Sequence, residues 1–202
     1  MNIDLTSAAW YLARGSGLTS LVLFSLVVAL GIGSRSGRTL FGLPRFAVQA
    51  VHSTAALTAV GFLALHVVTL LFDPYAQLKL LDLVLPFTGA YRPFWLGLGT
   101  LALDLMLAVV VTSLLRDRLG PRAWKAVHWA AYAAWPVAVL HGLGTGTDAS
   151  ALWMQVTTAA CVSLVAAASV WRLTPGFGRP ARPLTRHTAP AAMAARPQEL
   201  VR

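Results

Sequence analysis

Apolar positions along this chain gather into five long runs, separated by short segments that are polar or basic. Each run has the length of about 20 residues that a helix needs to cross the hydrocarbon core of a bilayer. The pattern therefore predicts an all-α membrane protein, a bundle of five transmembrane helices. The predicted spans cover residues 10–32, 46–72, 94–115, 124–143 and 151–171.

Two further segments complete the predicted organisation. Residues 73–93 are too short to span and too apolar for a solvated loop, so we expect an interfacial helix between the second and third spans. Residues 173–202 are rich in Pro, Ala and Arg and lack a periodic apolar face, which predicts a disordered basic cytoplasmic tail. The expected domains are a membrane domain, 1–172, and this tail, which is too short for a nucleotide-binding domain.

Composition and charge agree with a membrane class. The chain is 57% hydrophobic and 11% charged, and its mean hydropathy is +0.67. The net charge of +9 lies in short loops and the tail, so we expect a lipid bilayer and no nucleic acid as partner. Basic residues concentrate between the first two spans, between the third and fourth, and after the fifth. The positive-inside rule then places the N-terminus outside and the C-terminus in the cytoplasm of a multi-pass cell (plasma) membrane protein.

Four of the five histidines lie inside apolar runs, where ionisable side chains are rare and usually functional. His52 and His66 are 14 residues apart on the second span, so they share a face about 21 Å apart along the helix. His128 and His141 lie on the fourth span, which runs in the same direction. We therefore expect His52 to pair with His128 on the inner side and His66 with His141 on the outer side.

Two imidazoles at each level do not make a zinc site, because no cysteine or carboxylate is placed to complete one. They suffice when a planar macrocycle supplies four more nitrogens, which predicts two stacked bis-histidine b-type haems per chain. His52 and His128 would ligate the inner haem iron, and His66 and His141 the outer one. Two alternatives stay open: a non-haem membrane protein that uses these histidines for proton relay or transport, and a haem-binding assembly subunit with no turnover of its own.

Supporting residues each have a functional and a purely structural interpretation. Arg14 lies at the depth of the outer propionates, or snorkels to the interface. Ala59 lies seven residues from each histidine of its span and leaves room between two porphyrins, or serves close helix packing. Trp135 faces the gap between the haems, or packs in the bundle. Asp104, in the middle of the third span, carries protons or holds a water, or pairs with a neighbouring helix.

The fourth span has an awkward spacing. Thirteen residues on an ideal helix leave His128 and His141 about 140° apart in direction. Pro136 lies between them, and proline kinks or rewinds helices. We therefore predict an irregularity at Pro136.

The paired spacing, H-x13-H on one helix and H-x12-H two helices later, resembles the ferric reductase-like transmembrane domain family. That family includes ferric reductases, NADPH oxidases and the haem subunits of methionine sulfoxide reductase systems. The sequences W-Y-L-A-R-G-S-G at 10–17 and H-G-L-G-T-G-T-D at 141–148 are similar to actinobacterial members. The resemblance implies a membrane b-type cytochrome that transfers electrons through two stacked haems.

The chain departs from the eukaryotic members of that family, because it carries neither their FAD and NAD(P)H domain nor their first helix. The resemblance therefore implies that a separate flavoprotein reductase or a quinol is the electron donor. An acceptor or partner protein is expected at the outer face, with ferric iron, oxygen and a quinone among the candidates. We expect the chain to be the haem-bearing membrane component of an oxidoreductase.

Overall fold

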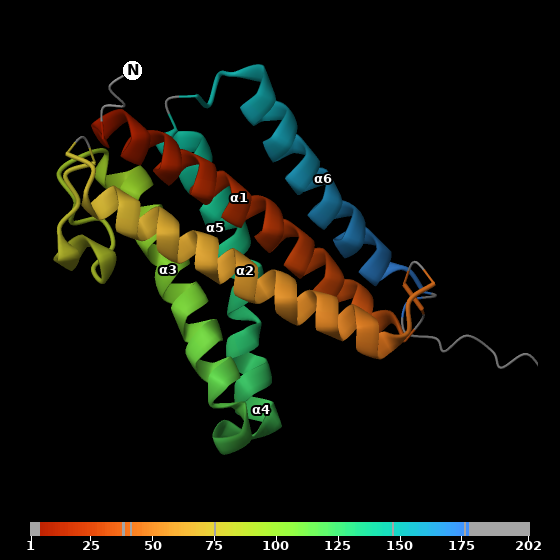
Figure 1. The fold of residues 1–202 in the computed structure, drawn as a ribbon. Helices are drawn as coiled ribbons and strands as arrows, with labels where there is room; N and C mark the ends of the chain where they lie inside the picture. Colours follow the sequence, from red (N-terminus) through yellow and green to blue (C-terminus); the bar gives the residue numbers. More distant parts are fainter. Residues whose placement is uncertain are drawn as a thin grey trace, which may run out of the picture.

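The computed structural model describes residues 5–37, 39–40, 42–74, 76–146, 148–175 and 177, and its regular elements are helices (Figure 1). Most of the predicted tail lies outside these described residues, so its disorder stays a prediction. Short 3-10 helices, η1 (Ser34–Ser36) and η2 (Leu80–Leu83), lie in the loops. The α-helices are α1 (Leu5–Gly33), α2 (Arg45–Leu71), α3 (Pro93–Leu114), α4 (Arg116–His128), α5 (Ala130–Thr145) and α6 (Leu152–Leu173).

Four helices, α1, α2, α3 and α6, are long and apolar enough to cross a membrane. They correspond to four of the five predicted spans. The remaining predicted span, 124–143, is divided at Trp129 between the end of α4 and α5, which has 16 residues. The protein is thus an all-α integral membrane protein whose fifth apolar run is interrupted.

The interruption lies between the two histidines of the run, His128 and His141, where the 13-residue spacing predicts an irregularity. It lies at Trp129, and the predicted position, Pro136, is wrong. The helix continues through Pro136, whereas Tyr132 donates its N–H to the carbonyl of Trp129, only three residues back. A proline disturbs the turn on its N-terminal side, because its ring crowds the carbonyl four residues earlier and its N–H is missing. Trp129 lies seven residues before Pro136, beyond the Tyr132 carbonyl that the proline ring would crowd, and its backbone angles are helical (φ −63°, ψ −22°), so the irregularity is a local tightening of one turn.

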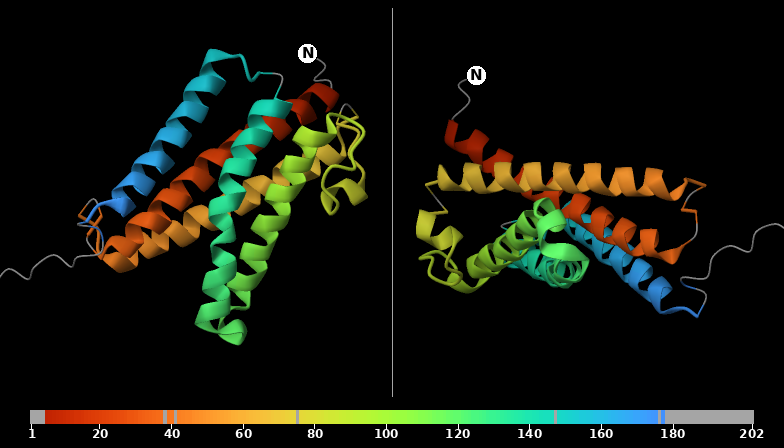
Figure 2. Two further views of the ribbon diagram at one scale, coloured as in Figure 1. Left: turned by 180° about the vertical axis from the view of Figure 1, so that it is seen from behind. Right: turned by 90° about the horizontal axis from the view of Figure 1, so that it is seen from below.

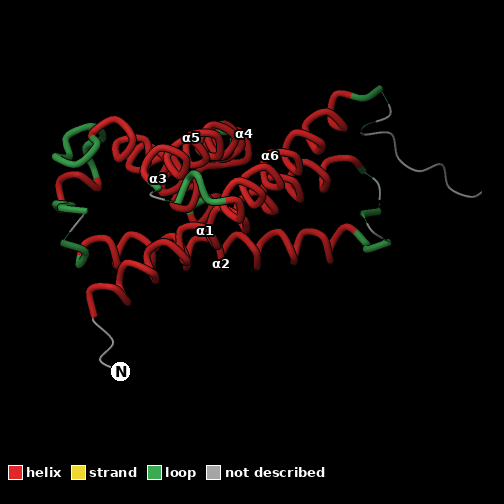
Figure 3. The backbone as a smooth tube through the Cα atoms, turned by 90° about the horizontal axis from the view of Figure 1, so that it is seen from above, coloured by secondary structure: helices red, strands yellow, loops and turns green. Residues whose placement is uncertain are grey.

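Helix α1 is the centre of the bundle. It runs beside α2 and α6, and the pair formed by α3 and α5 crosses this group (Figures 1 and 2). Seen from above, α2 runs along one side of the molecule and α3, α5 and α6 lie together on the other side, while α1 crosses past α2 (Figure 3). A cluster of buried apolar side chains lies where α1, α5 and α6 meet: Phe24, Val28, Ile32, Ala134 and Val165.

Two hydrogen bonds from small polar side chains link α1 to its neighbours. The Ser20 hydroxyl donates to the carbonyl of Ala59 on α2 at 3.0 Å. The Trp135 indole N–H donates to the Ser25 hydroxyl at 2.9 Å, which links α5 to α1. Serine allows close approach of helices in a membrane and supplies polar contacts that lipid does not offer. These contacts fix α2 and α5, which carry His52, His66 and His141, to one scaffold.

Among the described residues between α2 and α3, the regular structure is the 3-10 turn η2, and no α-helix is seen there. The predicted position of this segment at the membrane surface stays a prediction. Asp82 organises this segment. Its carboxylate accepts hydrogen bonds from the backbone N–H of Lys79 at 3.0 Å and the Thr88 hydroxyl at 2.8 Å. Its carbonyl accepts from the Thr100 hydroxyl on α3 at 2.6 Å. The two bonds to the carboxylate hold the pKa of Asp82 below its usual value.

We expect the order of this segment to depend on the ionised carboxylate of Asp82. The folded pKa is lower than the unfolded value of about 3.9, so the stabilisation is complete above that pH and is lost as the pH falls through the folded pKa. Hydrogen exchange, corrected for intrinsic rates, should show the amides of 79–85 losing protection between about pH 5 and about pH 2. Asp82→Asn should show weaker protection at neutral pH and no such pH dependence; identical profiles for the two proteins would contradict the role of Asp82.

Candidate functional site

The outer pair of histidines meets as the sequence predicts. His66 on α2 and His141 on α5 face each other with their ring centres 6.4 Å apart and their planes at 76°. Helices α2 and α5 do not pack closely here, so the two imidazoles project into the space between them.

Each outer imidazole is anchored through Nδ1 to a backbone carbonyl of a different helix. His66 Nδ1 lies 2.7 Å from the Ala13 oxygen on α1, and His141 Nδ1 lies 2.9 Å from the Trp95 oxygen on α3. A carbonyl only accepts, so Nδ1 of a neutral imidazole must carry the proton and Nε2 is left with its lone pair. No hydrogen bond from another described residue engages either Nε2. This arrangement is typical of metal-ligating histidines, whose second nitrogen is held by a carbonyl.

Glycines allow this close approach, and the sequence analysis missed them. A Cβ at Gly17 would lie 2.7 Å from His66 Nδ1, and a Cβ at Gly99 would lie 2.5 Å from His141 Cε1. Gly31 similarly faces His52: a Cβ at Gly31 would lie 3.3 Å from His52 Cε1. One signal was available: Gly17 and Gly31 are 14 residues apart, the same spacing as His52 and His66 on the next helix.

A cavity of about 470 Å³ opens beside the outer pair, within the size range of cofactor sites. Its walls come from α1, α2, α3, α5, the start of α6 and the adjoining loops, and they are mainly apolar. His66, His141, Arg14 and Ala59 line it, and Ala59 is 3% exposed. The cavity therefore brings together four of the residues that the sequence singled out.

The inner pair, His52 and His128, is built differently. His52 Nδ1 lies 3.1 Å from the Val27 oxygen on α1, so it is anchored like the outer pair. His128 lies within electrostatic reach of His52, but its buried Nδ1 has no hydrogen-bond partner. Among the described residues, no group of three or more His, Cys, Asp or Glu is placed to hold a metal ion. Each site thus offers two imidazoles and no further side-chain ligand of these types.

The remaining predicted residues lie in distinct surroundings. Arg14 forms an ion pair with Asp148 in the loop before α6, and its guanidinium lies 4.2 Å from the ring centre of Trp10. Trp135 packs against the buried cluster of α1, α5 and α6 and is not part of the cavity wall. Asp104 makes no hydrogen bond or ion pair with another described residue. The haem-related roles of Arg14, Trp135 and Asp104 stay predictions.

Comparison with known proteins decides the family. The family model described as ferric reductase like transmembrane component matches residues 16–139, more than half of the chain. The chain belongs to this family. No curated protein and no solved structure matches it. Membership confirms the resemblance stated from the sequence, and it implies transmembrane electron transfer by a component of a kind that typically binds haem.

The match of this ferric reductase-like component contains three of the paired histidines, His52, His66 and His128, and ends two residues before His141. His141 enters the site through geometry: its ring faces His66, and its Nδ1 bonds to Trp95. The structure thus adds the fourth imidazole to the region that the family model covers.

Adding a methyl group to the glycines that face the outer imidazoles should displace those rings. We expect Gly17→Ala and Gly99→Ala to break the hydrogen bonds at Nδ1 and to weaken ligand binding at the outer site by about 10- to 100-fold, the usual effect of losing such a contact. Haem content per purified chain, with spectral titration of added haem, measures this.

Matched controls lie close by in the chain. A Cβ at Gly15 or at Gly61 meets nothing within 4 Å, and neither residue lines the cavity, so Gly15→Ala and Gly61→Ala should bind haem as the natural protein does. Equal losses in the control and test variants would show that helix composition matters and the imidazole contact does not.

Proposed function

We propose that this chain transfers electrons across the membrane through two b-type haems. The observation that carries the proposal is the outer pair, where two anchored imidazoles face each other with ring centres 6.4 Å apart. Two metal–imidazole bonds of about 2 Å each, extended from each nitrogen to its ring centre, give a separation of about 6 Å. The rings are therefore spaced for one iron between them.

The chain's own residues make a suitable haem site. His66 and His141 would hold the outer iron through Nε2, while Ala13 and Trp95 keep the protons on Nδ1. The apolar cavity walls exclude water, and Ala59 leaves space on the inner side. His52 and His128 would hold the inner iron as a second pair of imidazoles, of which, among the described residues, only His52 is anchored to a backbone carbonyl, that of Val27. A bound haem supplies one-electron redox chemistry at its iron, tuned by these ligands and their burial.

The orientation that we propose has the N-terminus outside and the C-terminus in the cytoplasm of the cell membrane. The α1–α2 loop and the C-terminal end of α6 lie at the same end of the bundle (Figures 1 and 2). Arg35, Arg45 and Arg172 lie there, and the positive-inside rule assigns such an end to the cytoplasm. The His52 and His128 site would then be the inner one.

Electrons would enter from a separate flavoprotein reductase or a quinol and leave to an acceptor or partner protein at the outer face. In this proposal the paired imidazoles, His52 with His128 and His66 with His141, would hold the groups that carry the electrons. We assign no catalytic residue at either face.

An optical spectrum tests the proposal. Purified protein reduced with dithionite should show b-type bands and contain about two haems per chain, the number that two bis-histidine sites hold. His66→Ala should remove the outer haem and keep the inner one, and His52→Ala should do the reverse. A colourless, iron-free preparation after expression with ample haem would overturn the proposal in favour of proton relay or transport.

Arg14 offers a second test. If its guanidinium also stabilises the outer propionates, Arg14→Ala should lower the outer haem's occupancy or its reduction potential. A nearby cation favours the reduced haem, which is the more negative state, so its loss should lower the potential by tens of millivolts. A shift of about 59 mV is a tenfold change in a one-electron equilibrium. Asp148→Asn removes the ion-pair partner but keeps the cation, so it should not reproduce this loss. Redox titrations that are identical for Arg14→Ala and the natural protein would remove the role.

A further inference from the structure

Three of the four paired imidazoles are fixed by the same device. Nδ1 of His52, His66 and His141 lies within 3.1 Å of a backbone carbonyl on a neighbouring helix. His128 is the exception: its Nδ1 is buried and has no hydrogen-bond partner among the described residues. A buried polar atom without a partner is costly, and no carbonyl fixes the orientation of this ring.

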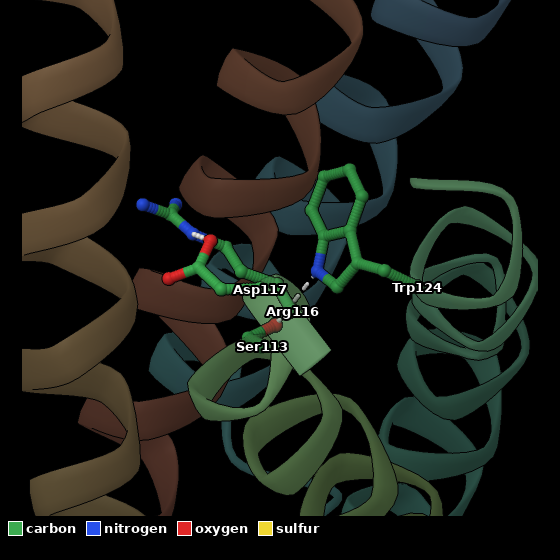
Figure 4. Close-up of polar contacts among 4 residues, drawn as sticks. All are labelled: Ser113, Arg116, Asp117 and Trp124. Atoms are coloured by element: carbon green, nitrogen blue, oxygen red, sulfur yellow. Dashed lines mark hydrogen bonds and ion pairs between the residues drawn. The ribbon is translucent and has the colours of Figure 1, made fainter. Parts of the chain in front are cut away.

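A tryptophan takes the place of the missing acceptor. Trp124 precedes His128 by one turn of α4, and the two rings are stacked, with centres 5.0 Å apart and planes at 27°. The Trp124 indole N–H points toward the end of α3 and donates to the Ser113 hydroxyl at 3.3 Å (Figure 4). Arg116 and Asp117, at the start of α4, form an exposed ion pair with each other. The imidazole is thereby linked to α3 through the indole.

We propose that Trp124, anchored by Ser113, is a positioning residue for His128 and sets the ring orientation that backbone carbonyls set for the other three imidazoles. This rests on the proposed function, in which His128 is an iron ligand. A stacked imidazole whose Nδ1–H has no acceptor donates less electron density than one bound to a carbonyl. The inner site is therefore distinguished from the outer one by its ligand orientation and by its weaker electron donation.

Substitutions at Trp124 and Ser113 test this in the full-length, haem-loaded protein. Trp124→Leu removes the stacked ring and should weaken inner-haem binding by about 10- to 100-fold and shift the inner haem's low-spin EPR signal and potential, with the outer signal unchanged. Trp124→Phe keeps a stacked ring and should restore occupancy in part. Ser113→Ala removes only the anchor and should move the inner signal in the same direction by less. The two signals are assigned from His52→Ala and His66→Ala.

The matched control is Trp129, which adjoins His128 and contacts Tyr132 instead. Trp129→Leu should leave the inner signal as it is in the natural protein. The proposal is overturned if Trp124→Leu and Ser113→Ala keep the natural inner signal, or if Trp129→Leu has the same effect as Trp124→Leu. Should Trp124→Leu not fold, Ser113→Ala decides alone. If the natural protein binds no haem, the proposed function is overturned. If it binds two haems and Trp124→Leu leaves the inner signal unchanged, only this inference is overturned.

Discussion

An imidazole donates to a carbonyl inside a transmembrane helix only where its ring reaches the helix backbone. Everything around the outer site follows from this requirement. Gly17 removes the side chain that would meet His66, and Gly99 does the same for His141. The bonds then made at Nδ1 leave the Nε2 lone pairs available on two rings that line a largely apolar cavity. The glycines, the carbonyls and the loose packing between α2 and α5 are therefore parts of one arrangement, in which ring orientation is decided before any ligand arrives.

The sequence predicted much of the fold, because a bilayer demands long apolar helices and excludes most alternatives. It also predicted which imidazoles face each other across the outer site, since helix direction follows from alternating spans. It did not predict the break at Trp129, the carbonyl that each histidine uses or the partner of Arg14. Periodicity gives the face on which a side chain lies, whereas these contacts depend on how far one helix is shifted along its neighbour.

The two sites differ in how they are bounded. The outer one is lined by a cavity and has both imidazoles bonded to the backbone, while the inner one has one bonded imidazole and one stacked on Trp124. The difference originates in α4, where Gly120 adopts a left-handed backbone angle of 76° before Pro121 and turns the chain back toward α3. That turn brings Trp124 to Ser113, and the ordinary helix that α5 forms near His141 has no equivalent.

The shared spacing on α1 and α2 has a mechanical consequence. Ala13 and Val27 are 14 residues apart on α1, and the histidines bonded to them are 14 apart on α2. A slide of α2 along α1 would break both bonds at once, so neither imidazole can adjust its depth independently. The helix pair fixes the separation of the two sites along the helix axis at about 21 Å. In the proposed electron-transfer role, the distance that an electron would cross between the two sites would therefore be set by the α1–α2 pair and not by the loops at either membrane face.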